Sequence, residues 1–171
     1  MEVPLFKQSN QKTCGPTALQ MVLARFGQRV RHSDILKYVG GIKSNGVNTV
    51  DLANFARQLG FQVECLSYNK KLAKGGAEIR TPSFKDVKKH LNQGVPVILA
   101  VNSPILYGGK ISNEGHFIVL TGYRDGLFTY NDPFDGEAHE IDEEHLLFAW
   151  HNNVLDSSAY LLAVWPKTHS V

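Results

Sequence analysis

The sequence contains little cysteine, little net charge and no long apolar run. Its two cysteines, Cys14 and Cys65, are too few for a disulfide framework and lack the CxxC spacing of a structural zinc site. The longest apolar run, residues 95–101, is far shorter than the roughly 20 residues that a membrane-spanning helix needs. Eighteen Lys and Arg residues against sixteen Asp and Glu residues leave a net charge of +2. These scarcities disfavour a membrane-spanning protein and a dedicated nucleic-acid binder.

The N-terminal residues also lack a basic start followed by an apolar stretch and a small-residue cleavage site. We therefore expect a cytoplasmic protein, unless a leader has been removed from the chain. The 171 residues and the 43 % share of hydrophobic residues fit a folded chain that buries a substantial core. We expect a single domain that spans residues 1–171.

The hydrophobic pattern changes its period along the chain. Apolar residues recur at helical spacing in the first third, whereas most of the second half alternates or runs apolar as strands do. The predicted helices span residues 16–26, 33–39, 48–59, 83–93 and 142–150, and the predicted strands span residues 61–66, 95–101, 115–123, 127–131, 138–141 and 160–165. Residues 70–76 and 103–113 are predicted to be loops. Helices followed by an antiparallel sheet indicate an α+β fold.

The two cysteines receive different interpretations. Cys14 lies where the first helix begins, so free N–H groups and the positive end of the helix dipole would favour a thiolate nucleophile there. The alternative is a small buried apolar residue. Cys65 alternates with Phe61 and Val63, which predicts a core position, with a redox partnership with Cys14 as the alternative.

Three further residues are candidates for the same site. His116 follows Gly115 at the start of an apolar strand, where a rigid imidazole could act as a general base, although many such histidines only pack. Asp132 ends the returning strand of the predicted hairpin, so its carboxylate could orient that ring, or it could be a turn residue before Pro133. Gln8 precedes Cys14 on an extended approach, and its carboxamide could stabilise an oxyanion.

Together these segments resemble the C39-type, bacteriocin-processing-like family of papain-like cysteine peptidases. Residues 8–27 are similar to the family's segment with the glutamine and the cysteine, and residues 115–123 and 130–133 are similar to its histidine strand and its Asp-Pro segment. The resemblance implies a papain-like fold, with N-terminal helices that carry the cysteine packed on a C-terminal antiparallel sheet that carries the histidine and the aspartate. It also implies four roles: Gln8 as oxyanion donor, Cys14 as nucleophile, His116 as base and acid, and Asp132 as the residue that orients the histidine.

The resemblance extends to function with one departure. The best-known members are domains of peptide-exporting ABC transporters that cut leader peptides after Gly-Gly, but this chain contains no transporter segment and no nucleotide-binding motif. It is therefore similar to the stand-alone branch, which implies a peptide or protein substrate, with a Gly-Gly leader as one candidate. Another acyl transferase or deamidase on the same scaffold, or a catalytically silent peptide-binding module, stays open as an alternative.

No cofactor or metal is expected for this chemistry. The segment with His139, Glu140 and His145 misses the HExxH spacing of zinc peptidases. Residues 131–136 are a poor calcium loop, because Pro133 stands where that loop needs an oxygen ligand.

Overall fold

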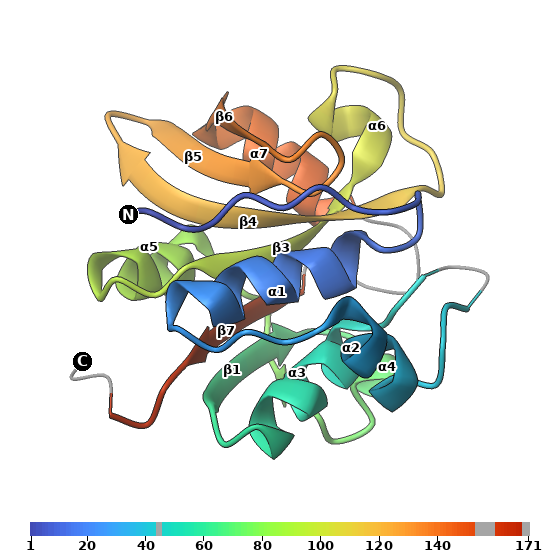
Figure 1. The fold of residues 1–171 in the computed structure, drawn as a ribbon. Helices are drawn as coiled ribbons and strands as arrows, with labels where there is room; N and C mark the ends of the chain where they lie inside the picture. Colours follow the sequence, from blue (N-terminus) through green and yellow to red (C-terminus); the bar gives the residue numbers. More distant parts are fainter. Residues whose placement is uncertain (44–45, 153–159, 169–171) are drawn as a thin grey trace.

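The fold is built around one seven-stranded sheet. A computed structural model describes residues 1–43, 46–152 and 160–168. The strands follow the spatial order β2-β1-β7-β3-β4-β5-β6. Figure 1 labels the six strands from β1 to β6 in this order. They are β1 (Gln62–Ser67), β2 (Glu78–Ile79), β3 (Val97–Asn102), β4 (Gly115–Arg124), β5 (Leu127–Asp132), β6 (Glu137–Asp142) and β7 (Leu161–Trp165). Every neighbouring pair is antiparallel except β1 and β2, which are parallel.

Helices cover both faces of this sheet. They are α1 (Cys14–Arg25), α2 (His32–Tyr38), α3 (Thr49–Gln58), α4 (Lys70–Ala73), α5 (Phe84–Asn92), α6 (Ser103–Leu106) and α7 (Glu143–His151). Buried residues of α1, α2 and α3 form one hydrophobic cluster with one face of the sheet. Buried residues of α5, α6 and α7 form a second cluster with the other face. None of the helices described here is long and apolar enough to cross a membrane.

The central strand β3 explains how one sheet serves two cores. Ile98 and Ala100 belong to the cluster with α1, whereas Leu99 and Val101 belong to the cluster with α7. Successive side chains of a strand point to opposite faces, so a strand covered on both sides is apolar throughout. This is the physical origin of the apolar run at residues 95–101. The predicted α+β fold, with the cysteine-bearing helix packed on the sheet, is confirmed.

The helix caps and the hairpin turn that the sequence predicts are present in the structure. The Asn48 side chain accepts a hydrogen bond from the Val50 N–H at 2.8 Å and begins α3, and Ser83 and Asp86 form a capping box at α5. Between β4 and β5, Asp125 and Gly126 both have positive φ, at 51° and 84°. Two such residues form the tight turn whose twist matches an antiparallel hairpin.

Two predicted loops contain short helices, which corrects the sequence-based prediction. Residues 70–76 include α4, and residues 103–113 begin with α6. The N-terminus of α6 is capped by Asn102, whose side chain accepts a hydrogen bond from the Ile105 N–H at 3.3 Å, and Pro104 lies in its first turn. The sheet also contains a short strand that the sequence did not predict, β2, which pairs with β1 in parallel, whereas the C-terminal strands that carry His116 and Asp132 are antiparallel as predicted.

Candidate active site

Cys14 is the first residue of α1, and the turn before it is well held. The Thr13 hydroxyl donates to the Asn10 carbonyl at 2.9 Å, and the Lys12 N–H donates to Asn10 Oδ1 at 3.0 Å. The Cys14 side chain is almost buried, with 7 % exposed. The first N–H groups of a helix have no carbonyl one turn earlier, and Pro16 carries no N–H at all. The helix start therefore offers a thiol, a free backbone donor and the positive end of the helix dipole at one point.

The β4–β5 register brings His116 and Asp132 to the same face of the sheet. Val119 pairs with Asn131, so Asp132 is placed opposite Ile118 in this antiparallel pair. His116 lies two residues beyond Ile118 and therefore shares its face, on the diagonal from Asp132. The two side chains meet across that diagonal: His116 Nε2 lies 2.7 Å from Asp132 Oδ1.

The imidazole lies between the carboxylate and the thiol. The Cys14 thiol acts on the same imidazole and favours its charged form. Because Nε2 is bound to Asp132, Nδ1 is the ring nitrogen left to interact with the sulfur. His116 is 7 % exposed and Asp132 is wholly buried. The structure thus brings three of the residues that the sequence singled out into one line of contacts.

The electrostatics of this line favour a charged imidazole. Burial alone would lower the pKa of His116, but its hydrogen bonds to Asp132 and Cys14 and the attraction of their charges outweigh burial and raise it to about 9. Burial alone would raise the pKa of Asp132, but the hydrogen bond from His116 and the His116 charge hold it below its usual range. His116 is therefore an imidazolium at neutral pH, beside a carboxylate.

Gln8 reaches this region through the N-terminal segment. The Asn131 side-chain amide donates to the Val3 carbonyl at 3.0 Å, and the Met1 amino group donates to the Thr121 carbonyl at 2.8 Å, so the segment runs along β4 and β5 before it turns into α1 (Figure 1). The Gln8 N–H donates to the Pro133 carbonyl at 2.7 Å, directly after Asp132. The Gln8 carboxamide is half-buried, and its Oε1 atom has no hydrogen-bond partner among the described residues.

The turn after Asp132 is shaped by that carboxylate and by a close approach of the chain. Asp132 Oδ1 accepts a hydrogen bond from the Phe134 N–H at 2.8 Å, and the Gly136 N–H donates to the Asp132 carbonyl at 2.8 Å. Gly136 has a φ of +77°, and a Cβ there would lie 3.1 Å from the Cβ of Lys7. Only glycine fits this turn without strain, and the turn keeps the N-terminal segment against β5.

Sequence reasoning missed Tyr107, which follows α6. Its hydroxyl donates to Asp132 Oδ2 at 2.7 Å, and its ring lies 6.2 Å from the His116 ring and 6.0 Å from the Phe134 ring, centre to centre. The contact joins residues 25 positions apart in the chain. The only local signal was the Asn102 cap with Pro104, which indicates an ordered turn after β3 in place of a free loop.

The Asp132 turn also gathers ligand atoms of the kind that metals use. Donor atoms of Asp132, Asp135 and His139 all lie within 4.8 Å of one another. His139 Nε2 is already 2.8 Å from Asp135 Oδ2, and both Asp132 oxygens already accept hydrogen bonds. An ion here would compete with His116 and Tyr107 for Asp132.

Cys65 lies in the core as predicted. It is 3 % exposed within the cluster formed with α1 and α3. Burial raises the pKa of its thiol to about 12, so it stays protonated and unreactive at neutral pH. Both cysteines are free, and the structure therefore contains no disulfide between Cys65 and Cys14.

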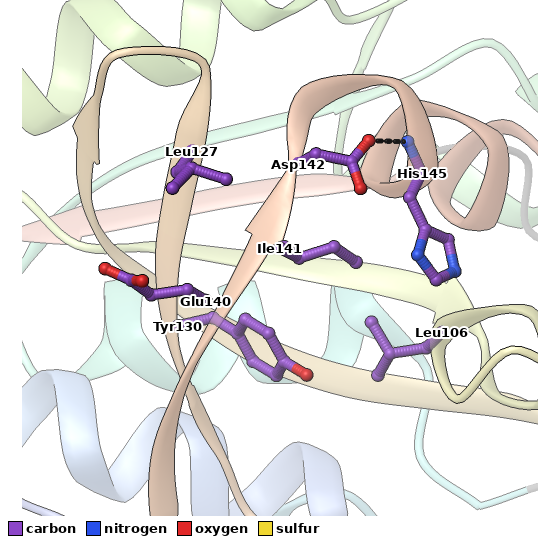
Figure 2. Close-up of a pocket in the computed structure, with 7 residues that line it drawn as sticks. All are labelled: Leu106, Leu127, Tyr130, Glu140, Ile141, Asp142 and His145. Atoms are coloured by element: carbon purple, nitrogen blue, oxygen red, sulfur yellow. Dashed lines mark hydrogen bonds between the residues drawn. The ribbon is translucent and has the colours of Figure 1, made fainter.

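A separate pocket of about 350 Å³ lies between β5, β6, α6 and α7 (Figure 2). Its lining residues are Leu106, Leu127, Tyr130, Glu140, Ile141, Asp142 and His145. None of the four predicted site residues lines it. Its nearest link to the site is Tyr130, whose pKa is raised to about 12 by burial and by the charges of Asp132 and Asp135.

Comparison with known proteins decides the family. A model of the Peptidase_C39 like family matches residues 1–155. The chain belongs to this family. The C39-like chain matches no curated protein.

Solved structures show the same fold for this C39-like chain. It is similar to a putative C39-like peptidase from Bacillus anthracis, with 17 % identity, a TM-score of 0.72, and 97 % of this chain and 96 % of that chain covered. It is also similar to the peptidase domain of Streptococcus ComA, a bi-functional ABC transporter involved in quorum sensing, with 15 % identity, a TM-score of 0.65 and coverage of 97 % and 100 %. A double glycine motif protease from an AMS/PCAT transporter, solved in complex with the leader peptide, has 22 % identity, a TM-score of 0.61 and coverage of 97 % and 93 %.

Proposed function

We propose that this C39-like chain is a cysteine peptidase that uses Cys14, His116 and Asp132. The observation that carries the proposal is the line of contacts from a helix-start cysteine through a histidine to a buried aspartate. Membership of the Peptidase_C39 like family supports the same reaction class. A cysteine that only filled space would need neither a raised histidine pKa nor a wholly buried carboxylate behind it.

In this mechanism the Cys14 thiolate attacks the carbonyl carbon of the scissile peptide bond. His116, charged at neutral pH, gives its proton to the leaving amine, and a thioester to Cys14 forms as the C–N bond breaks. A water molecule then loses a proton to His116 and attacks the thioester, which releases the carboxylic acid product and restores the thiolate with the imidazolium. Asp132 keeps the ring oriented and stabilises its charge through both steps.

Charge that develops on the carbonyl oxygen needs donors at fixed positions. The backbone N–H of Cys14, at the start of α1, supplies one of them. The side-chain N–H of Gln8 supplies the second, and the hydrogen bond of the Gln8 backbone to Pro133 fixes where the carboxamide begins. Two donors of this kind form an oxyanion hole.

The substrate that we propose is a peptide or protein segment, and a leader ending in Gly-Gly is the first class to test. The support is the similarity of fold to a double glycine motif protease solved with its leader peptide. A small pair of residues also suits a nucleophile of which only 7 % is exposed, because bulky side chains beside the scissile bond would leave less room for the peptide to approach Cys14.

The test is hydrolysis of a peptide library that includes Gly-Gly peptides, followed by mass spectrometry. Wild type is expected to cut, Cys14→Ala is expected to be inactive, and Cys65→Ala is the matched control that removes the other thiol. Hydroxylamine in the assay would reveal transfer to an amine in place of hydrolysis. Equal turnover by Cys14→Ala and wild type would end the proposal, as would tight peptide binding without any turnover by wild type.

A further inference from the structure

Asp132 uses both carboxylate oxygens, and each has a different partner. Oδ1 accepts hydrogen bonds from His116 Nε2 at 2.7 Å and from the Phe134 N–H at 2.8 Å. Oδ2 accepts from the Tyr107 hydroxyl at 2.7 Å. A wholly buried carboxylate needs such donors, because each oxygen left without one retains the full cost of desolvation. Tyr107 supplies the side-chain donor on the oxygen that does not face the imidazole.

The chain around Tyr107 holds its hydroxyl in place. Tyr107 directly follows α6, whose first turn is capped by Asn102. The Asn102 amide also donates to the Ser112 carbonyl at 2.7 Å, across the base of the β3–β4 connection. His145 of α7 hydrogen-bonds the Ile105 carbonyl at 2.6 Å. These hydrogen bonds fix the start of the β3–β4 connection and the helix before Tyr107, so the phenol is held in place although 51 % of Tyr107 is exposed.

We propose that Tyr107 is a positioning residue for the peptidase reaction, whose hydroxyl fixes the Asp132 carboxylate so that Oδ1 faces His116. The inference rests on the proposed function. Half of the Tyr107 surface stays in water, so core packing does not account for its place, whereas a short bond to a buried carboxylate does. A carboxylate held at one oxygen only can rotate about its bond to Cβ, and the imidazole that it orients would move with it.

The Tyr107 hydroxyl keeps its proton, and so stays a hydrogen-bond donor, over the pH range in which His116 is charged. Burial and the hydrogen bond to Asp132 raise the pKa of Tyr107 above its usual range, so it remains protonated where His116 is charged. It also favours the ionised form of Asp132. Removal of this donor raises the pKa of Asp132, and the acid limb of the pH profile follows it upwards.

The test compares Tyr107→Phe with wild type in the full chain, with Tyr123→Phe as matched control. The Tyr123 hydroxyl makes the same kind of bond, to Glu143 Oε2 at 2.8 Å, at the other end of β4. For Tyr107→Phe we expect kcat to fall about tenfold with KM nearly unchanged. We also expect the acid limb, for turnover and for alkylation of Cys14 by iodoacetamide, to move up by about one pH unit. Tyr123→Phe should match wild type in both.

Two results would overturn the inference. One is a Tyr107→Phe protein that melts at a lower temperature but keeps the wild-type rate and acid limb, which would mean a structural role only. The other is a full additional loss when Tyr107→Phe is added to Asp132→Asn, since a residue that acts through Asp132 loses its effect in that background. Alkylation needs no substrate, so it decides the role of Tyr107 even if wild type cleaves no peptide, a failure that would count against the proposed function alone.

Discussion

The backbone of Gly15 lies directly against the ring of Phe117, the residue that follows His116 in β4. A Cβ at position 15 would be 3.1 Å from two carbons of that ring and 3.2 Å from Leu52 Cδ1. Such distances are closer than side-chain packing normally allows. The missing side chain of Gly15 therefore lets the start of α1 approach β4, and this approach brings the Cys14 sulfur to His116.

Gly15→Ala is expected to damage activity more than stability. Alanine favours a helix over glycine by about 1 kcal/mol, which offsets part of the steric cost, but the helix start must move by a few tenths of an ångström. We expect kcat/KM to fall tenfold or more, on the order of magnitude that misplacement of a reacting group costs, with little change in melting temperature. Adding Phe117→Leu should recover part of the activity. Full activity in Gly15→Ala alone would show that this contact does not set the geometry.

Gln8→Ala is expected to lower kcat by about a hundredfold to a thousandfold, the cost of one oxyanion-hole donor, with KM nearly unchanged. Gln11→Ala is the matched control, because Gln11 lies on the same approach to Cys14 but is exposed. Steady-state kinetics on one peptide substrate measure both variants. Equal losses at the two positions would remove the assigned role of Gln8.

The pH dependence of activity is expected to follow His116. Its pKa of about 9 places the alkaline limb near that pH, since the imidazolium is lost above it. Asp132→Asn removes the negative charge that supports the imidazolium, so the limb should move to lower pH. Asp135→Asn, which changes a neighbouring carboxylate bound to His139, should leave the limb in place.

The same His116 shift affects folding. Because its folded-state pKa of about 9 is above the ordinary 6.5, the charged ring stabilises the fold fully below pH 6.5, and this contribution disappears as the pH rises through 9. Urea unfolding of wild type and His116→Gln on both sides of that window measures it. A stability difference that did not change across the window would contradict the assignment.

Asp86→Asn is expected to destabilise the protein without affecting catalysis. Asp86 receives two hydrogen bonds from Arg80, at 3.0 and 2.8 Å, and caps α5 through the Ser83 N–H at 2.8 Å. Its hydrogen bonds from Arg80 lower its pKa to about 2, so their stabilisation is present above pH 3.8 and is lost as the pH falls towards 2. We expect a loss of about 1 kcal/mol from the cap alone, measured by urea unfolding at neutral pH.

Glu78→Gln is the control for that experiment. Glu78 binds the same Arg80, but 62 % of its side chain is exposed, and such pairs contribute little in water. Its unfolding free energy should stay close to that of wild type. If Glu78→Gln lowered the free energy of unfolding more than Asp86→Asn did, Glu78 and not Asp86 would be the main partner of Arg80.

The sequence predicts those parts of the site that depend on local rules. A helix that begins near Cys14 and a hairpin that turns at Asp125 and Gly126 both follow from short-range spacing, and the structure has them. The hairpin alone brings Asp132 within reach of His116, because register and alternation fix which side chains share a face. The resemblance to C39-type peptidases supplied the roles, and the family match bears out that resemblance.

The parts that were missed depend on contacts far apart in the chain. A four-residue helix such as α6 is too short to show a hydrophobic period, and the two residues of β2 form a strand only because β1 lies beside them. The bond from Tyr107 to Asp132 joins the β3–β4 connection to the end of β5, and their relative position depends on the whole sheet. No spacing rule predicts a contact of that kind.

The hydrogen bond from the Gln8 N–H to the Pro133 carbonyl has a mechanical consequence. It fastens the residue proposed to stabilise the oxyanion to the same short turn that begins with the carboxylate behind His116. A displacement of this turn would therefore move two groups together: the Gln8 carboxamide, proposed to stabilise the oxyanion, and the Asp132 carboxylate that orients His116. The proposed nucleophile, Cys14, lies separately at the start of α1, so a change confined to this turn would affect the proposed reaction while both hydrophobic clusters stay packed.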